Sequence, residues 1–236
     1  MGYMIHTSNA HLSIGDLNGG IGTRRFDPAK MYLRPLEPDE VEVPWSEEWT
    51  CVACYKAERC SKCKKMAVHI NSIIVAVDGA CRGNGTSHAK AAAAVYFGPQ
   101  SAYNVARVLN SPDPTNQKAE LEAGIIALER ALAISKNERF YSYDDDSGAL
   151  LETVVVKTDS EYLAKGMSEW VLKWEQNGYI NSRGLPVLNA SLFRTLQSLA
   201  AELEERDVKV LFWHVPRHLN KKADQMANNA LDGKPI

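Results

Sequence analysis

Apolar and polar positions divide most of the chain into short strands and longer helices. The β-branched run Ser72–Asp78 (SIIVAVD) is typical of a buried strand. Apolar residues at helical spacing over Thr115–Ile134 predict a helix, with Thr115 or Asn116 as its N-cap. The same patterns predict strands at Ala91–Phe97, Tyr103–Leu109, Thr153–Lys157 and Val208–Val215, and helices at Glu161–Gly166, Glu169–Gln176, Ala190–Arg206 and Lys221–Leu231.

The order of these elements predicts the fold class. Three strands followed by alternating helices and strands indicate an α/β domain, with a mixed sheet flanked by helices, over residues 70–236. Residues 1–50 combine little periodicity with many Gly, Pro and acidic residues, so we expect an irregular or partly disordered leader. A small irregular Cys-rich segment, residues 51–66, separates the two, and residues 140–150 read as a polar loop.

Composition narrows the class of protein. With 236 residues, 45% of them hydrophobic, the chain suits one domain of ordinary size plus an appendage. It has neither an apolar run of the roughly 18 residues that a membrane span needs nor a signal peptide. We therefore expect an intracellular protein, cytoplasmic or nuclear. We also expect a monomer. A net charge of −2 argues mildly against a nucleic-acid partner, but residues 51–65 hold five Lys or Arg against one Glu.

Four acids stand at the edges of the predicted core, namely Asp78, Glu120, Asp159 and Asp224. A lone ionised carboxylate is costly there, and the cost is offset if all four converge on divalent cations. Mg²⁺ favours oxygen ligands, and two ions a few ångströms apart can stabilise both the attacking and the leaving oxygen in phosphodiester hydrolysis. Taken singly, each acid also reads as a helix cap or a strand-end residue.

Four short sequence motifs show a family resemblance. They are Asp78-Gly79-Ala80-Cys81-Arg82-Gly83-Asn84-Gly85, Thr115-Asn116-Gln117-Lys118-Ala119-Glu120, Thr158-Asp159-Ser160 and Asn220-Lys221-Lys222-Ala223-Asp224. In this order, over Ser72 to Leu231, the chain resembles the type 1 ribonuclease H family. The resemblance implies an RNase H-like fold with a five-stranded mixed sheet, and a metal-dependent endonuclease. Such an enzyme cuts the RNA strand of RNA–DNA hybrids to leave 5′-phosphate and 3′-hydroxyl ends.

The resemblance also implies roles for single residues. The four acids match the family's catalytic ligands for two Mg²⁺ ions, with Mn²⁺ as an alternative. Asn84, Asn116 and Gln117 match residues that contact the hybrid in its minor groove, where amides can bond 2′-hydroxyls and base edges. Ser160 and Thr115 match backbone contacts. For the residues from Thr115 to Gln117, an ordinary helix start explains the pattern equally well.

Residues 169–188 resemble the family's substrate-binding protrusion. Trp170, Trp174 and Tyr179 match its aromatic positions, and Lys173 can guide phosphates of the DNA strand. The alternative is that the tryptophans, spaced four apart, are core residues on one helix face; Trp174, among polar neighbours, is the better substrate candidate. Glu175 and Gln176 stand where the family tends to have lysines, which predicts weaker binding.

The segment before Asp224 departs from the family pattern. The family commonly has Val-Pro-Gly-His in a flexible loop, whereas this chain has Arg217 in place of the glycine and a shorter loop. His218 is the candidate catalytic histidine, although the short loop can keep it from the metals. His214 lies on an apolar strand and reads as structural.

The cysteines predict a second metal site. Cys51, Cys54, Cys60 and Cys63 form two Cys-x2-Cys pairs, which in an intracellular protein indicate structural Zn²⁺. Disulfides, free thiols and an iron–sulfur cluster are the alternatives. Cys81 is expected to be buried. The basic residues around the cluster suggest either a nucleic-acid contact or a stabiliser of the following strand.

Two other functions compete with a ribonuclease H. One is an RNase H-like nuclease that acts on another nucleic acid. The other is a catalytically weak or inactive protein that only binds hybrids. The Thr-Asn-Gln-x-x-Glu word and the tryptophans favour ribonuclease H over the first, and the presence of all four acids argues against the second.

Overall fold

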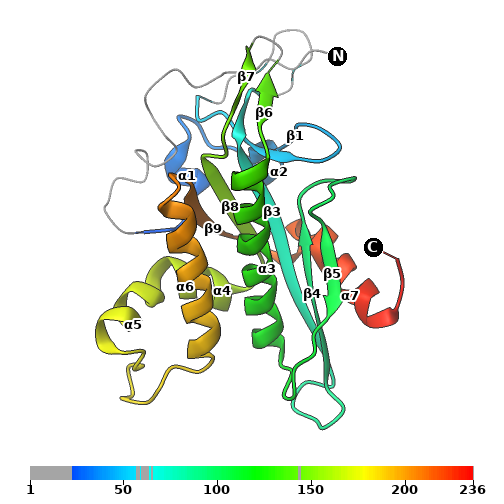
Figure 1. The fold of residues 1–236 in the computed structure, drawn as a ribbon, viewed down its shortest axis with the longest axis vertical. Coiled ribbons are helices and arrows are strands. Elements are labelled where there is room, and N and C mark those ends of the chain that lie inside the picture. The colour runs from blue at the N-terminus through cyan, green and yellow to red at the C-terminus, as the bar shows by residue number, and fades with distance from the viewer. Residues whose placement is uncertain (1–22, 57–58, 60–63, 65, 143–144, 236) are drawn as a thin grey trace.

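A mixed sheet runs through the protein, with helices along it (Figure 1). The computed structural model describes residues 23–56, 59, 64, 66–142 and 145–235. Its first elements are α1 (Pro28–Met31), α2 (Pro38–Val41), β1 (Glu42–Pro44) and β2 (Thr50–Ala53). There follow β3 (Val68–Arg82), β4 (Lys90–Tyr96), β5 (Val105–Val108), α3 (Asn116–Asn137), β6 (Phe140–Ser142), β7 (Asp145–Ala149), β8 (Thr153–Thr158) and α4 (Glu161–Lys165). The last are a π-helical turn (Gly166–Trp170), α5 (Val171–Asn177), α6 (Ala190–Glu204), β9 (Lys209–His214), a 3-10 turn (Arg217–Leu219) and α7 (Lys221–Asp232).

The strand β3 organises the sheet. One edge of β3 pairs antiparallel with β2 along its first half and with β4 along its second half, and β4 in turn pairs with β5. Its other edge pairs in parallel with β8, which continues in parallel to β9. The predicted mixed α/β sheet is therefore confirmed in β3, β4, β5, β8 and β9, and β1 and β2 extend it to seven strands.

Helices cover both faces of this sheet. On one face, the start of α3 lies directly against β3, where Gly79 approaches the backbone of Ala119. On the other face, α7 packs Met226 and Ala227 against Ala94 of β4. Because successive strand residues point to opposite faces, Asp78 faces the α7 side and Gly79 faces α3.

Residues 23–50 of the predicted leader form short elements and contribute side chains to the core. The backbone of Arg24 and Phe26 pairs with Phe212, which adds one bridge to the outer edge of β9. Arg24 donates two hydrogen bonds, of 2.8 and 2.9 Å, to Glu204 of α6. The short elements α1, α2 and β1 lie within this part of the leader. Each of them buries one side chain, which is too few to leave a periodic pattern in the sequence.

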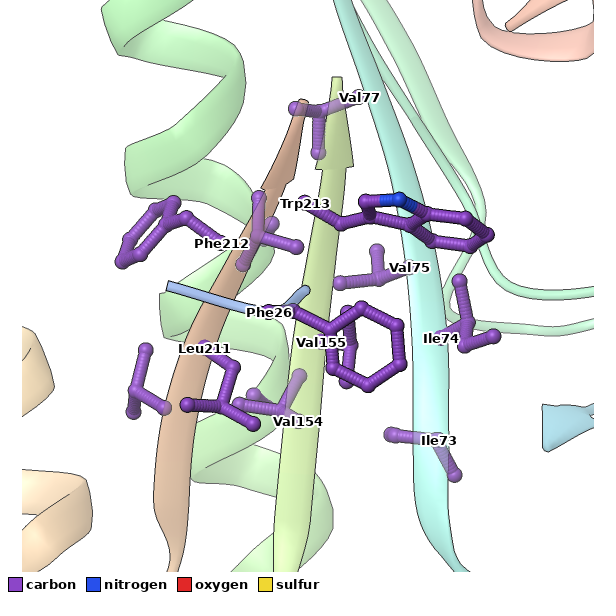
Figure 2. Close-up of a cluster of buried hydrophobic side chains, with 14 of the residues drawn as sticks. Phe26, Ile73, Ile74, Val75, Val77, Val154, Val155, Leu211, Phe212 and Trp213 are labelled. Carbon is purple, nitrogen blue, oxygen red and sulfur yellow. The ribbon is translucent and has the colours of Figure 1, made fainter. Parts of the chain in front are cut away.

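The leader shares the face of the sheet that α7 occupies. Figure 2 shows the ring of Phe26 beside the indole of Trp213, over the strand that carries Val155. The two ring centroids lie 5.2 Å apart, and Phe26 is 2% exposed. Full burial of a Phe side chain contributes roughly 1.5–3 kcal/mol, so this segment stabilises the sheet directly.

Three local predictions differ from the structure. Residues 140–150, expected as a polar loop, include the strands β6 and β7. The two short helices expected around Gly166 form one run, because the π-helical turn joins α4 to α5. Cys81 is partly exposed and not buried. No helix in the described part of the chain is long and apolar enough to cross a membrane.

Candidate active site

The four predicted acids come from four elements that meet near the middle of the sheet. Asp78 lies on β3 and is 8% exposed, and Asp159 directly follows the parallel neighbour β8. Adjacent parallel strands end at the same edge of a sheet, which brings these two carboxylates together. Glu120 projects from the first turns of α3, and Asp224 from the first turn of α7.

Gly79 permits the approach of α3 to β3. A Cβ atom added at Gly79 would lie 2.2 Å from both the carbonyl carbon of Ala119 and the amide nitrogen of Glu120. Any side chain there would push the start of α3 away from the sheet. The Asp-Gly pair of the sequence therefore places one acid on the strand and lets a second come close to it.

The pKa of Asp78 reports the crowding of negative charge. Burial is the first cause that raises this pKa, and the carboxylates of Asp159, Asp224 and Glu120 raise it further, to about 7. The guanidinium of Arg217 acts in the opposite direction. Burial also raises the pKa of Glu120, against a hydrogen bond from Ser160 and with a contribution from Asp159. The acids thus sense one another electrostatically.

Amide and hydroxyl donors hold Glu120 from two sides. Asn116, one turn earlier on α3, donates a hydrogen bond of 2.7 Å to Oε1. The hydroxyl of Ser160, next to Asp159, donates to Oε2. The side chain of Asn84 accepts a hydrogen bond of 3.4 Å from the backbone of Asn116. A continuous chain of contacts therefore runs from the β3–β4 loop through Glu120 to the end of β8.

Asn220 and Arg217 hold the other two acids. Asn220 is 1% exposed, and its Nδ2 donates to Oδ1 of Asp159 at 2.7 Å and to the carbonyl of Val77 at 2.9 Å. Arg217 forms an ion pair and a hydrogen bond with Asp224. Neither residue is among the predicted site residues, although the place of Asn220 at the start of the last helix, four residues before Asp224, was a readable signal.

The donor set suits a hard divalent cation. Four carboxylates supply only oxygen ligands, and their mutual repulsion at Asp78 is what a cation would offset. As they stand, no three His, Cys, Asp or Glu side chains among the described residues are arranged to hold a metal ion. Oxygens of Glu120, Asp159 and Asp224 are instead engaged by protein donors, through the hydrogen bonds and the ion pair described above.

The predicted hybrid contacts lie beside the acids. Thr115 is the N-cap of α3 and accepts a hydrogen bond of 3.2 Å from the backbone of Lys118, as the helix-start interpretation expects. Gln117 is exposed on the first turn of that helix. Ser160 caps α4 and also contacts Glu120. Asn84, Asn116 and Gln117 thus flank the acids at the start of α3, and their contact with a hybrid stays a prediction.

The aromatic residues of the predicted protrusion pack on one another. Trp174 lies 5.0 Å from Phe193 of α6 and 5.7 Å from Trp170, measured between ring centroids. Tyr179 is 6% exposed, and Arg194 lies 4.2 Å above its ring. These contacts favour the core interpretation for the two tryptophans, and Tyr179 is buried as well. Lys173 is exposed and remains available for phosphates.

His218 lines a cleft whose lining includes none of the four acids. It is exposed, and the cleft, of about 470 Å³, is also lined by Glu42 and Lys157. Among the described residues, no hydrogen bond or ion pair joins His218 to any of the four acids. Its catalytic role stays a prediction. His214, which pairs with Thr158 at the end of β9, is exposed.

The cysteines divide between the core and the undescribed part of the chain. Cys51 is fully buried on β2, with its Sγ 3.7 Å from the carbonyl oxygen of Ile70. Burial raises the pKa of its thiol, which disfavours the thiolate that zinc requires. Cys54 is also buried, directly after β2. Cys60 and Cys63 lie outside the described residues, so the four-cysteine site stays a prediction.

The mixed sheet carries Asp78 on one central strand and Asp159 at the end of its parallel neighbour, and Glu120 and Asp224 come from helices packed on that sheet. This arrangement defines an α/β domain with a candidate site made of four carboxylates. A family model described as RNase H matches residues 70–232. The chain belongs to the RNase H family, and the residues matched include all four acids.

Individual relatives agree with the family model. Ribonuclease H1 of Mus musculus is 31% identical over 160 residues, which are 66% of this chain and 49% of the relative. Ribonuclease H of Prochlorococcus marinus (strain NATL2A) is 30% identical over 165 residues, 70% of this chain and 91% of the relative. Among solved structures, the PFV RNase H domain is 21% identical, with a TM-score of 0.49, and the match covers 69% of this chain and 95% of that one. The chain thus spans about half the length of its mammalian relatives.

Proposed function

We propose that this protein hydrolyses the RNA strand of RNA–DNA hybrids and leaves 5′-phosphate and 3′-hydroxyl ends. The observation that carries the proposal is the meeting of Asp78, Glu120, Asp159 and Asp224 within a match to the RNase H family. Relatives named ribonuclease H support the substrate class. We further propose that the protein acts as a monomer on hybrids inside the cell.

The four carboxylates are the groups that would hold two Mg²⁺ ions, or Mn²⁺ in their place. When bound, such ions activate water as a nucleophile and stabilise the leaving oxygen of the phosphodiester. Asn116 and Ser160 orient Glu120, and Asn220 orients Asp159. Arg217 pairs with Asp224, and its positive charge would attract a phosphate of the RNA strand.

The start of α3 would select the RNA strand. Asn116 and Gln117 present amides next to Glu120, and Asn84 contacts the backbone of Asn116 from the β3–β4 loop. Amides can donate to and accept from a 2′-hydroxyl, the group that distinguishes RNA from DNA. Exposed Lys173 would contact phosphates of the DNA strand without reading sequence.

Cutting assays on four matched substrates test the proposal. The substrates are labelled hybrid, double-stranded RNA, single-stranded RNA and DNA, each with and without Mg²⁺. We expect cutting of the hybrid alone, dependent on Mg²⁺ and lost in Asp78→Asn. Exposed Asp113→Asn serves as the matched control and should cut like the wild type.

The outcomes separate the competing functions. Tight binding of the hybrid by the wild type without any cutting would identify a protein that only binds hybrids. Cutting of single-stranded RNA or DNA at a similar rate would identify a nuclease of different substrate class. Both outcomes contradict the proposal, and the end groups of the fragments check its chemistry.

A further inference from the structure

Lys157 is buried in the middle of the sheet, two residues before Asp159. It lies on β8 between Ala76 of β3 and Trp213 of β9, and its side chain is 5% exposed. A lysine charge withdrawn from water in this way is costly unless an opposite charge lies close by. Among the described residues, the carboxylate that pairs with Lys157 comes from the leader and not from the family-matched domain.

Glu42 of the leader is the partner of Lys157. Its Oε1 lies 2.6 Å from the Nζ of Lys157, and its side chain is 23% exposed. Burial raises the pKa of Glu42, while the lysine charge lowers it and so favours the ionised carboxylate. Glu42 is itself fixed in place, because β1 pairs with β2 through Glu42 and Val52, and β2 pairs with β3.

We propose that Glu42 is a positioning residue for the active site, which acts through Lys157 to fix the end of β8 where Asp159 begins. The path from the ion pair to the acids is short. Thr158 follows Lys157 and accepts a backbone hydrogen bond of 2.9 Å from Val215. Asp159 comes next, and then Ser160, which holds Glu120.

The end of β8 also positions the polar contacts around the acids. Asn220 donates a hydrogen bond of 2.7 Å to Asp159, and Ser160 donates one to Glu120, so both contacts depend on where β8 ends. The pair of Glu42 and Lys157 holds the same strand two residues before Asp159. A strand end held in place keeps the carboxylates ready for cations, and a misplacement of about 1 Å at such a site can cost on the order of a hundredfold in rate.

This inference rests on the proposed function, and two readouts keep the two apart. The first is kcat and KM on the hybrid. The second is the Mg²⁺ concentration that gives half of the maximal rise in melting temperature, which needs no activity. A wild type that cut no hybrid would defeat the proposed function, and the second readout would still decide the role of Glu42.

Glu42→Gln in the full chain is the main variant, and Glu202→Gln is its control. The control also removes a carboxylate from a lysine, but at the exposed pair with Lys136 on the helices. We expect Glu42→Gln to lower kcat by about fivefold to fiftyfold, with KM within about twofold, and to raise the Mg²⁺ midpoint by about threefold or more. The control should match the wild type in all three.

Two further variants make the test decisive. Glu42→Asp keeps the charge, and we expect it to recover most of the lost Mg²⁺ affinity. If Glu42→Gln does not fold, Lys157→Met replaces it as the variant that removes the ion pair. Lys157→Met should reproduce the losses of Glu42→Gln. A lower melting temperature in both Glu42→Gln and Lys157→Met, with kcat and the Mg²⁺ midpoint unchanged, would show a merely structural pair and overturn the proposal.

Discussion

The side-chain amide of Asn220 donates a hydrogen bond of 2.7 Å to Asp159, across more than sixty residues of sequence. The same nitrogen bonds the carbonyl of Val77, next to Asp78. One buried amide therefore ties the start of α7 to two strands that carry acids. We expect Asn220→Ala to destabilise the protein by about 1–3 kcal/mol, because it leaves a buried carbonyl without its partner.

Activity and stability should both change in that variant. Denaturant unfolding measures the loss of stability, and kcat on the hybrid should fall at the same time because Asp159 loses its orienting donor. Asn229→Ala, at the exposed end of the same helix, is the control. An Asn220→Ala protein with unchanged kcat would show that Asp159 does not depend on this bond.

The raised pKa of Asp78 predicts how stability depends on pH without metal. Its folded pKa, about 7, lies above the ordinary value of an aspartate, so folding favours the protonated form. That contribution is fully present below about pH 4 and is lost as pH rises through 7, a change on the order of 2–4 kcal/mol. Asp78→Asn lacks this loss, so it should be more stable than the wild type at pH 8.

Thermal unfolding in a chelator at pH 5 and pH 8 checks this expectation. The gap in melting temperature between Asp78→Asn and the wild type should widen as pH rises. Saturating Mg²⁺ should stabilise the wild type more than the variant. A gap that stays constant over this range would mean that Asp78 does not carry the excess charge.

Gly79→Ala tests the close approach of α3 to β3. The added methyl group would lie 2.2 Å from the backbone of Ala119 and Glu120, which cannot yield as a side chain would. We expect a loss of about 1–3 kcal/mol in the free energy of unfolding and a fall in kcat, because Glu120 moves away from Asp78. Gly85→Ala, where added atoms meet open space, is a control for the loop, although its positive φ adds local strain.

We expect Arg217 to compete with a divalent cation for Asp224. Its guanidinium pairs with that carboxylate and lowers the pKa of Asp78. Arg217→Gln removes one positive charge, so we expect Mg²⁺ to bind about twofold to tenfold more tightly. Calorimetric titration of the apoprotein with Mg²⁺ measures the change. Weaker Mg²⁺ binding in the variant would mean that Arg217 prepares the site and does not compete for it.

A substitution at Cys51 tests whether this residue is a buried core residue or a zinc ligand. Because its side chain is fully buried at an apolar position, Cys51→Val should change the free energy of unfolding by less than about 1.5 kcal/mol. Any zinc measured in the purified wild type should remain in the variant. Loss of zinc in Cys51→Val, together with loss in Cys63→Ser, would instead support the four-cysteine site.

The patterned domain was predictable because its elements are long and each buries one face. The β-branched run at Ser72–Asp78 and the helical spacing over Thr115–Ile134 both correspond to elements of the structure, β3 and α3. The gathering of Asp78 and Asp159 followed from the parallel pairing of their strands. The short sequence motifs around the acids therefore predicted both the fold and the choice of the four acids.

The leader and the donors around the acids were not predictable in the same way. Phe26 contacts Trp213, and Glu42 pairs with Lys157. No local sequence pattern predicts a contact between residues so far apart in the chain. Asn220 and Arg217 lie close to Asp224 in the sequence. The partner of a polar side chain, however, is determined only by the tertiary structure. Trp174 was the better substrate candidate of the two tryptophans because its neighbours in sequence are polar, and these neighbours give no sign of its contact with Phe193.

The bridge that Arg24 and Phe26 make with Phe212 has a practical consequence for anyone who shortens the gene. A protein trimmed to the family match would start near residue 70 and lack this bridge. The outer edge of β9 and the indole of Trp213 would then face water, which is the usual origin of edge-to-edge aggregation between sheets. Expression of the catalytic unit should therefore begin before Arg24, even though the recognisable family sequence begins much later.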